Sequence, residues 1–313
     1  MSRVSVIIPN LNGLRLLDTC FGALWQQAYR DFEVIMVDDA STDSSIEWTR
    51  EHYPEIRIIR LPKTSGLAIA CNSGAAVAKG EILVMLNNDT EVEPGWLQAI
   101  VVAMDEDPCI GAVASKMLLF HQRDTLHTTG DMVGRDGIPR NRGVWEKDLG
   151  QYDTRTEIFG ACGGSAAYRR AAWEAVGGFE ESFFMYLEDV DLAWRLQLQG
   201  WKAKFAPQAR VYHYLSATGG GPIASFHTGR NSIRVIVRNT PSAVLRKYWT
   251  RIVRSQTKVA IDAVKALRGI SARARLRGQV AGLLDIPRLL PERSRILANM
   301  RVSAVDIERL LVE

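Results

Sequence analysis

The chain has 313 residues, of which 47% are hydrophobic and 24% are charged, an ordinary balance for a globular protein. This composition excludes a disordered, collagen-like or disulfide-stapled chain, and the length suits one large domain or one domain with an appendage. The four cysteines (Cys20, Cys71, Cys109 and Cys162) are far apart, form no Cys-x-x-Cys pair and lie among apolar or small residues. Such surroundings are typical of buried free thiols, so we expect a reducing compartment and neither a zinc site nor a disulfide framework.

The net charge of +4 is divided unevenly along the chain. From Leu245 onward there are 15 basic and 6 acidic residues, a net charge of +9, which leaves −5 for the preceding residues. We expect this basic tail to meet an anionic surface. The stretch before Pro9 lacks the features of a secretory signal, and no apolar run approaches the ~18 residues that a membrane-spanning helix needs. The sequence therefore predicts a cytoplasmic protein, with the inner face of the plasma membrane as a candidate site of association.

Short β-branched runs alternate with helical patterns over the first third of the chain, which is typical of strand–helix units on a largely parallel sheet. Strands are expected at 4–8, 32–37, 56–61, 81–86 and 109–118, with helices between them at 14–27, 44–52, 66–78 and 94–104. Neither a Gly-x-Gly-x-x-Gly motif nor a Walker-type Gly-Lys-Ser/Thr motif follows the first strand. Dinucleotide binding and P-loop phosphate transfer therefore lose their main support.

The pattern becomes less regular in the second half. Residues 121–153 are rich in Gly, Asp and Arg without a period, and such long irregular segments are usually functional or mobile. Helices are expected at 170–176 and 188–199, strand-like pieces at 203–214, and a flexible turn at 219–222. After residue 270 we expect short helical segments that are broken by Pro287 and Pro291.

Three acidic clusters lie at expected strand ends or loop edges. They are Asp38-Asp39, Asn87-Asn88-Asp89, and Glu188-Asp189 with Asp191. Because ligands of open α/β sheets bind at the carboxyl ends of the strands, the first two clusters should face one crevice. Carboxylates gathered there without matching lysines suit a divalent cation that bridges a phosphorylated ligand.

The sequence runs around these clusters resemble family 2 glycosyltransferases of the GT-A fold. The resemblance rests on four motifs in order, namely VSVIIPNLNG, VDDASTD, LNNDT and LEDVDLAWR, and it covers roughly residues 3–239. Within the family the chain is most similar to bacterial rhamnosyltransferase-type members that build surface polysaccharides. The resemblance implies an α/β fold, with a mixed, mostly parallel sheet flanked by helices. It also implies a catalytic domain at 1–240, with a nucleotide-binding half at 1–118 and an acceptor half at 119–240, and a basic helical extension at 241–313.

The resemblance also implies a site for a nucleoside-diphosphate sugar, with dTDP- and UDP-sugars as the expected donors. Asp39 would hold the base or ribose, and the other residues assigned to the donor are Pro9, Asn12, Asp38, Asn72, Asn88 and Arg230. Asp89 corresponds to the last acid of the D-x-D motif of the family, which binds Mg²⁺ or Mn²⁺. Asn87 stands at the first position of that motif, which removes one charge, and His213 is the further candidate ligand. A packed or hydrogen-bonded role for His213 stays open.

On the acceptor side, the resemblance implies that Asp189 is the general base of an inverting transfer, with Glu188 beside it. A carboxylate there takes a proton from the acceptor hydroxyl as that hydroxyl attacks the anomeric carbon. Gly160, Cys162 and Gly163 are assigned to the acceptor, because small residues let a sugar approach the backbone. Structural alternatives are a helix N-terminal charge for Asp189 and a turn or capping carboxylate for Asp39.

Two basic segments, the one that contains Arg230 and Arg238 and the one at 245–268, are each compatible with two roles. Arg230 and Arg238 are either arginines of a mobile lid that reach the donor diphosphate, or part of a solvated helix face, which we favour for Arg238. Trp194 and Arg195 are expected at core and surface positions of one helix. In 245–268 an apolar face lies opposite a cationic face, which suits either an interfacial membrane helix or docking on the catalytic domain or a second protomer.

The sequence thus predicts an inverting glycosyltransferase that moves a sugar, with rhamnose as a candidate, to a hydroxyl of a glycan or lipid-linked acceptor. The alternative is a non-catalytic scaffold that binds nucleotide-sugar or glycan through a degenerate metal motif, although the intact Glu188-Asp189 pair argues against it. No nucleic-acid partner is expected, because the aromatic residues Tyr248 and Trp249 lie on the apolar face of the tail. A homodimer stays open.

Overall fold

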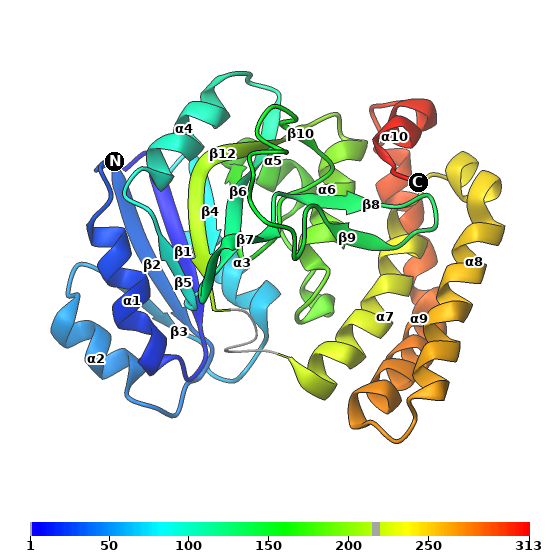
Figure 1. Ribbon diagram of the computed structural model, residues 1–313, viewed down its shortest axis with the longest axis horizontal. Coiled ribbons are helices and arrows are strands. Elements are labelled where there is room, and N and C mark those ends of the chain that lie inside the picture. Colours follow the sequence, from blue (N-terminus) through cyan, green and yellow to red (C-terminus); the bar gives the residue numbers. More distant parts are fainter. Residues whose placement is uncertain (1, 215–219) are drawn as a thin grey trace.

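The computed structural model describes residues 2–214 and 220–313, in which a central sheet is followed by a layer of helices (Figure 1). The sheet has the strand order β10-β12-β6-β11-β4-β1-β2-β3, with β5 paired to β12 and β7 paired to β6. Its strands are β1 (Val4–Asn10), β2 (Phe32–Asp38), β3 (Arg57–Arg60), β4 (Ile82–Leu86), β5 (Thr90–Val92), β6 (Ile110–Leu119), β7 (Gln122–Thr128), β10 (Glu157–Ile158), β11 (Ser165–Arg169) and β12 (Lys202–His213).

The half of the sheet formed by β1 to β4 is parallel, because β1 pairs with both β2 and β4 in parallel and β2 pairs with β3 in parallel. In the other half, β11 runs antiparallel to β4 and β6, whereas β12 runs parallel to β6. This confirms the predicted mixed sheet flanked by helices. The parallel arrangement places the ends of β1, β2 and β4 at one edge, where the first two acidic clusters follow.

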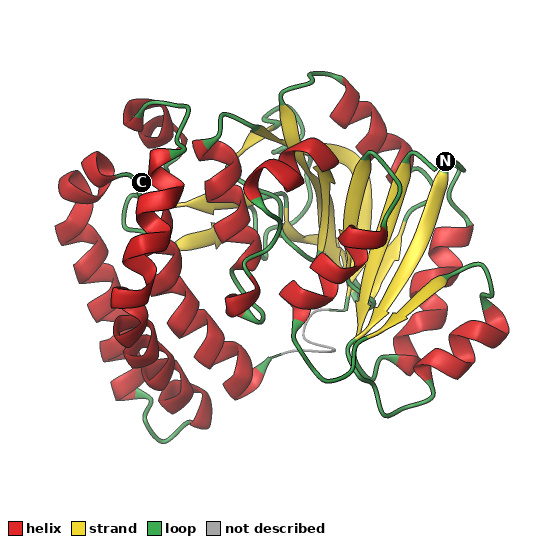
Figure 2. Ribbon diagram, turned by 180° about the vertical axis from the view of Figure 1, so that it is seen from behind, coloured by secondary structure: helices red, strands yellow, loops and turns green. Residues whose placement is uncertain are grey.

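Helices cover both faces of the sheet (Figure 2). One face is covered by α1 (Leu14–Trp25), α2 (Ser45–His52) and α4 (Trp96–Asp105), and the other by α3 (Leu67–Val77), α5 (Arg170–Val176) and α6 (Glu188–Leu198). Successive strand residues point to opposite faces, so Val6 and Ile8 join the first core while Ile7 joins the second. Burial on both faces explains the nearly continuous apolar runs of β1 and β4.

Beyond α6, a helical layer consists of α7 (Gly221–Asn239), α8 (Ser242–Lys265), α9 (Ile270–Ala298) and α10 (Ala304–Leu310). A third core, which includes Trp194, Ile236 and Ile252, joins this layer to α6. The helices α7 and α9 approach closely at two glycines of α9. A Cβ at Gly278 would lie 2.1 Å from the carbonyl oxygen of Phe226 in α7, so a side chain there would force the two helices apart.

The expected break at Pro287 and Pro291 is wrong, because α9 continues through both prolines. Each proline removes a backbone donor and costs about 3 kcal/mol inside a helix. Packing on the neighbouring helices offsets this cost, because Leu289 between them is buried and Arg293 donates a hydrogen bond of 2.7 Å to the carbonyl of Val237.

The segment 121–153 is more ordered than expected, and it contains β7 as well as a separate two-stranded sheet of β8 (Asp131–Val133) and β9 (Pro139–Asn141). The buried Lys116 holds its far end, with its Nζ atom 3.0 Å from Asp148 and 2.7 Å from Asp153. The short strand β11 and the 3₁₀ helix η1 (Glu181–Phe183) were also not predicted. All four cysteines are free, but Cys109 is exposed rather than buried.

The tail helix α8 combines features of both alternatives. Tyr248, Ile252 and Ala263 are buried, so part of the apolar face docks on the rest of the chain. Trp249 and Leu267 of the same predicted face remain 57% and 44% exposed. Within the part of the chain that the structure describes, no helix combines the length and apolar character needed to cross a bilayer.

Candidate active site

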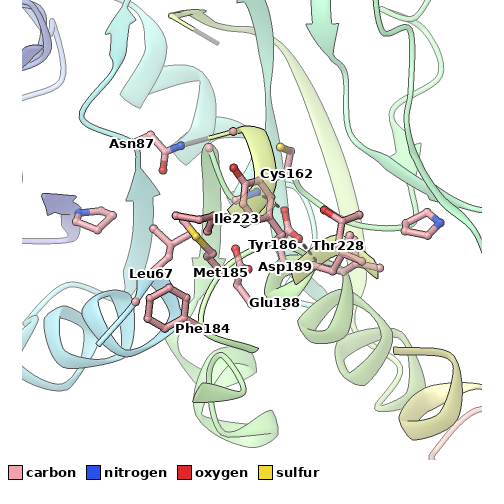
Figure 3. Close-up of a pocket in the computed structure, with 18 of the residues that line it drawn as sticks. Leu67, Asn87, Cys162, Phe184, Met185, Tyr186, Glu188, Asp189, Ile223 and Thr228 are labelled. Carbon is pink, nitrogen blue, oxygen red and sulfur yellow. Dashed lines mark hydrogen bonds between the residues drawn. The ribbon is translucent and has the colours of Figure 1, made fainter. Parts of the chain in front are cut away.

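A cavity of about 1110 Å³ lies at the carboxyl ends of β1, β2 and β4 and extends to the helical layer (Figure 3). It gathers most of the predicted site residues. Those that line it are Pro9, Asp39, Asn87, Asn88, Asp89, Cys162, Gly163, Glu188, Asp189 and His213. Figure 3 shows Glu188 and Asp189 close together, with Asn87 at a distance from them at the end of β4.

Asp39 is held by the loop that leads into α3. Its Oδ1 atom accepts a hydrogen bond of 2.7 Å from the backbone N–H of Ser65, and its Oδ2 atom accepts one of 2.9 Å from that of Gly66. Gly66 has a φ of +93°, and a Cβ there would lie 2.4 Å from the ring of Phe184. Only glycine suits this position, and the loop that it allows brings the backbone N–H groups of Ser65 and Gly66 to the carboxylate.

Asp89 and His213 are brought together because His213 in β12 pairs with Thr90 in β5. The Nε2 atom of His213 lies 3.0 Å from Oδ1 of Asp89, and its Nδ1 atom lies 3.1 Å from Nδ1 of His127. Burial lowers the pKa of His127 to about 3, and the nearby His213 adds to this effect, so His127 is neutral at physiological pH. His127 also lines the cavity, although the sequence analysis did not identify it.

The carboxylate of Asp89, the imidazole of His213 and the amide oxygen of Asn87 form the set of candidate cation ligands. Over residues 2–214 and 220–313, no group of three or more His, Cys, Asp and Glu side chains is arranged to hold a metal ion. The residues therefore fit a cation that takes some of its ligands from substrate phosphates, as Mg²⁺ does with one or two carboxylates. They do not fit a metal held by protein side chains alone.

Three carboxyl groups meet on the other side of the cavity. Asp189 accepts hydrogen bonds of 2.7 Å from the N–H of Gly163 and 2.8 Å from that of Val190. Glu188 and Asp131 are only 3% and 2% exposed, and their Oε2 and Oδ2 atoms have no hydrogen-bond partner among the described residues. Asp131 was not predicted as a site residue, because it lies within the segment 121–153, which has no regular period.

The three groups are tightly linked electrostatically. Burial raises the pKa of Glu188 to about 8, and the charge of Asp189 acts in the same direction. Burial and the charges of Asp189 and Glu188 raise the pKa of Asp131 well above its ordinary value. Burial also raises the pKa of Asp189, but the N–H groups of Gly163 and Val190 oppose the rise. Asp189 is therefore the group that carries the negative charge most readily.

Asp191 fixes the helix on which Glu188 and Asp189 lie. This fully buried carboxylate accepts hydrogen bonds of 2.8 Å from Asn239 and 2.8 Å from Arg195, and it lies 3.1 Å from the Nε atom of Arg238. Arg238 also pairs with Glu180 and Glu292. The predicted surface positions of Arg195 and Arg238 are therefore wrong, because both side chains are buried. Arg195 pairs with Asp191 of its own helix, whereas the acidic partners of Arg238 come from segments that are distant in sequence.

The segment before Glu188 has an unusual backbone. Phe184, Tyr186 and Leu187 have φ angles of 68°, 66° and 66°, which side-chain-bearing residues rarely adopt. The buried Asn231 of α7 donates from its Nδ2 atom to the carbonyls of Phe183, Met185 and Tyr186 at 2.8 to 3.1 Å. Strained backbone of this kind persists where surrounding contacts determine it, and it is concentrated at functional sites.

Asp38 and Asn12 do not line the cavity but shape the loop after β2. Asp38 is fully buried and accepts hydrogen bonds of 3.0 Å from the N–H of Ser41 and 3.3 Å from Asn10. The Oδ1 atom of Asn12 accepts one of 2.8 Å from the N–H of Thr42. Both residues act here as structural partners of the loop that carries Asp39.

Three further predicted residues also lie outside the cavity lining. Asn72 bonds to the backbone N–H and carbonyl of Phe179, and a Cβ at Gly160 would lie 2.5 Å from that of Ala193. Arg230 donates a hydrogen bond of 2.9 Å to Asp285 of α9 instead of reaching the cavity. The predicted turn at 219–222 begins at Gly219, which lies outside the described residues.

Comparison with known proteins gives a family match. The model of the family described as Glycosyl transferase family 2 matches residues 5–177. An O-antigen biosynthesis protein RfbC of Myxococcus xanthus is 33% identical over 69% of this chain and 18% of its own length. An N-acetylglucosaminyl-diphospho-decaprenol L-rhamnosyltransferase of Mycobacterium tuberculosis is 27% identical over 71% of this chain and 80% of its own length. The chain spans only 18% and 25% of the first two curated relatives.

Solved structures show the same fold. A mannosyltransferase PcManGT of Pyrobaculum calidifontis, in complex with GDP-Man and Mn²⁺, aligns with a TM-score of 0.55 and 20% identity over 98% of this chain and 78% of its own. Residues 1–349 of S. aureus TarS, in complex with UDP-GlcNAc, align with a TM-score of 0.58 and 16% identity over 99% of this chain and 93% of their own. The predicted GT-A architecture is confirmed by these similarities.

Proposed function

Because the chain belongs to glycosyl transferase family 2, we propose that it transfers a sugar from a nucleoside-diphosphate donor to a hydroxyl of a glycan or lipid-linked acceptor. The observation that carries this proposal is the cavity itself. Asp39 and Asp89 line one part of it, and the carboxyl groups of Glu188 and Asp189 line another. One cavity thus offers contacts for a nucleotide and a base for an incoming hydroxyl.

The proposed reaction is a single displacement with inversion at the anomeric carbon. Asp189 accepts the proton of the acceptor hydroxyl while the hydroxyl oxygen forms its bond to that carbon. The bond between the carbon and the phosphate oxygen breaks, and its electron pair leaves with the nucleoside diphosphate. Asp189 suits the role of base because the N–H groups of Gly163 and Val190 favour its charged form, while burial keeps its pKa raised.

A divalent cation, Mg²⁺ or Mn²⁺, would supply charge neutralisation to the departing diphosphate. Asp89, His213 and Asn87 would contribute its protein ligands, and His127 would hold the ring of His213 through its Nδ1 atom. A relative in the fold, GalNAc-T7, was solved with UDP, GalNAc and Mn²⁺. Arg275 of α9 also lines the cavity and has no acidic partner among the described residues, which suits it to a substrate phosphate.

The proposed sugar is rhamnose, carried by dTDP, and the proposed acceptor is a lipid-linked diphospho-sugar. The support is the similarity to the mycobacterial L-rhamnosyltransferase, whose name gives an N-acetylglucosaminyl-diphospho-decaprenol acceptor and of which this chain covers 80%.

Calorimetry tests the donor part of the proposal, with dTDP, UDP and GDP titrated into the protein with and without Mn²⁺. We expect one nucleotide to bind more tightly with Mn²⁺, and its sugar forms are then screened for transfer, with dTDP-rhamnose first. Binding without any transfer or donor hydrolysis would favour the non-catalytic scaffold. Absence of binding to all three nucleotides would contradict the proposal.

A further inference from the structure

Exposed apolar side chains are concentrated on two helices of the helical layer. Of the eighteen large hydrophobic residues that are exposed in the described part of the chain, ten lie between residues 249 and 290. On α8 they include Trp249, Val253 and Val264, and Leu267 follows in the turn to α9. Exposed apolar side chains that are concentrated on neighbouring elements, rather than scattered singly, indicate an interaction site.

The outer face of α9 is apolar as well. Val280, Leu283 and Leu284 are 55%, 56% and 75% exposed, and Leu290 is 50% exposed. They lie opposite Gly278 and Gly282, where α9 packs closely on α7. The inner face of α9 is therefore occupied within the chain, and the outer face is free to meet a partner.

The same two helices are strongly basic. Residues 245–290 contain eleven Lys and Arg but only two acids, Asp262 and Asp285. Asp285 is already paired with Arg230 and Arg234 of α7. Arg254, Lys258, Arg268, Arg277 and Arg288 have no acidic partner within residues 2–214 and 220–313. Apolar side chains bordered by unpaired cations are complementary to a lipid bilayer, which has an apolar interior and can carry anionic headgroups at its surface.

This surface adjoins the cavity. Gln256 and Val259 of α8 and Arg275 of α9 line the cavity, as does Ile223 near the start of α7, which is 61% exposed. The turn between α8 and α9 and the start of α7 lie at the same end of the molecule (Figure 1). A partner that covers the turn would therefore lie beside the entrance to the cavity.

We propose that the outer faces of α8 and α9 bind an anionic lipid bilayer, which brings the headgroup region to the mouth of the cavity. The bilayer contact itself does not depend on the proposed reaction. The benefit to catalysis rests on the proposed function, because a lipid-linked acceptor would then enter the cavity without leaving the bilayer.

Two other partners fit the surface less well. In a symmetric dimer the same patch faces itself, so the five unpaired cations on one copy would meet the same five on the other. Single-stranded nucleic acid binds through aromatic side chains that stack on bases, whereas the exposed apolar residues here are aliphatic except for Trp249.

Sedimentation with vesicles tests the proposal on the full chain. We expect binding to vesicles of phosphatidylcholine mixed with phosphatidylglycerol, much weaker binding to phosphatidylcholine alone, and release at high salt. The double variant Leu283→Glu, Leu284→Glu should bind at least about tenfold more weakly, because it places charges on the face that inserts. A charge variant, Arg268→Ala with Arg277→Ala, should bind more weakly to the mixed vesicles only.

Leu149→Glu is the matched control, because Leu149 is 83% exposed but lies outside α8 and α9. It should bind vesicles like the unchanged protein. Equal loss in this control, or no binding to the mixed vesicles, would overturn the proposal. So would a dimer that Leu283→Glu, Leu284→Glu dissociates, or preferential binding of single-stranded RNA over the vesicles. Nucleotide affinity, measured on the same variants, should stay unchanged, which separates a failure here from a failure of the proposed function.

Discussion

The proposed donor side and the proposed acceptor side of the cavity, which are called the donor side and the acceptor side below, both present carboxylates, but the hydrogen bonding of these carboxylates differs. Asp39 accepts a backbone hydrogen bond at each oxygen, and Asp89 is in contact with His213. On the acceptor side, Glu188 and Asp131 each keep a buried oxygen without a hydrogen-bond partner among the described residues, and their pKa values are raised. The carboxylates of the donor side are therefore stabilised by contacts within the chain, whereas those of the acceptor side keep an electrostatic cost beside Asp189, the proposed base.

The structural elements that hold the donor side and the acceptor side of the cavity also differ. The donor side depends on strand ends and the loops that follow them. The acceptor side depends on the helical layer, because Asp191 of α6 is bound by Arg238 and Asn239 of α7, and Asn231 holds the strained segment before Glu188. Changes in the helical layer should therefore affect turnover more than nucleotide binding.

The largest effect is expected from Asp189→Asn. Asparagine keeps the shape of the side chain but cannot accept the proton, so kcat should fall by about 10³-fold. The dissociation constant of the nucleotide should change by less than about twofold, because Asp189 lies on the acceptor side. Steady-state kinetics with the donor found in the screen, together with calorimetry, measure both quantities. Unimpaired turnover would exclude Asp189 as the base.

Asp191→Ala should mainly affect stability. Removal of this buried carboxylate leaves Arg195 and Arg238 without one of their charge partners, and loss of one member of a buried ion pair costs about 3–5 kcal/mol. Urea unfolding should show a lower midpoint with an unchanged slope. Glu308→Ala, which removes an exposed pair with Lys247 and a hydrogen bond from Tyr248, is the control and should lower the midpoint much less. Equal losses in the two variants would mean that Asp191 has no special role.

Asp39→Ala should weaken nucleotide binding by about tenfold, since a charge-assisted hydrogen bond contributes roughly 1.5–3 kcal/mol and two of them order the loop at Ser65 and Gly66. Turnover at saturating donor should change less than affinity. If kcat fell while the dissociation constant stayed the same, the division into donor and acceptor sides would be wrong.

Glu188→Gln should change how stability depends on pH. The folded protein holds the Glu188 proton up to a pKa of about 8, compared with an ordinary value of 4.5, so it binds more protons than the unfolded chain in between. Stability should therefore fall as the pH rises through this window, by at most about 1.4 kcal/mol per pH unit for one group. The variant removes this titration and should give a flatter profile in urea unfolding between these pH values. An identical profile would show that Glu188 ionises normally.

The sequence predicted the position of the site residues that follow the parallel strands. Asp39 and Asp89 each follow an apolar run that predicts a parallel strand. Because the carboxyl ends of parallel strands lie at one edge of the sheet, the sequence predicts that the two residues lie close together. It could not predict β11, because Ser165–Arg169 contains small residues without a β-branched pattern. The burial of Arg238 was missed for another reason. Its partners Glu180, Asp191 and Glu292 are far away in the sequence, and only the folded helical layer brings them together.

Asp131 was missed for the same reason, and its substitution should give the smallest effect. Asp131→Asn keeps the size of the side chain but removes one of the two carboxyl groups beside Asp189. Because the charge of Asp189 helps to hold the pKa of Asp131 well above its ordinary value, Asp131 is uncharged when Asp189 ionises, so the acid limb of the pH–rate profile should stay in place. We expect kcat at neutral pH to change by about threefold or less, because Asp131 does not itself transfer the proton. A loss as large as that of Asp189→Asn, with nucleotide binding intact, would instead identify Asp131 as the base and reverse the assignment of the two acids.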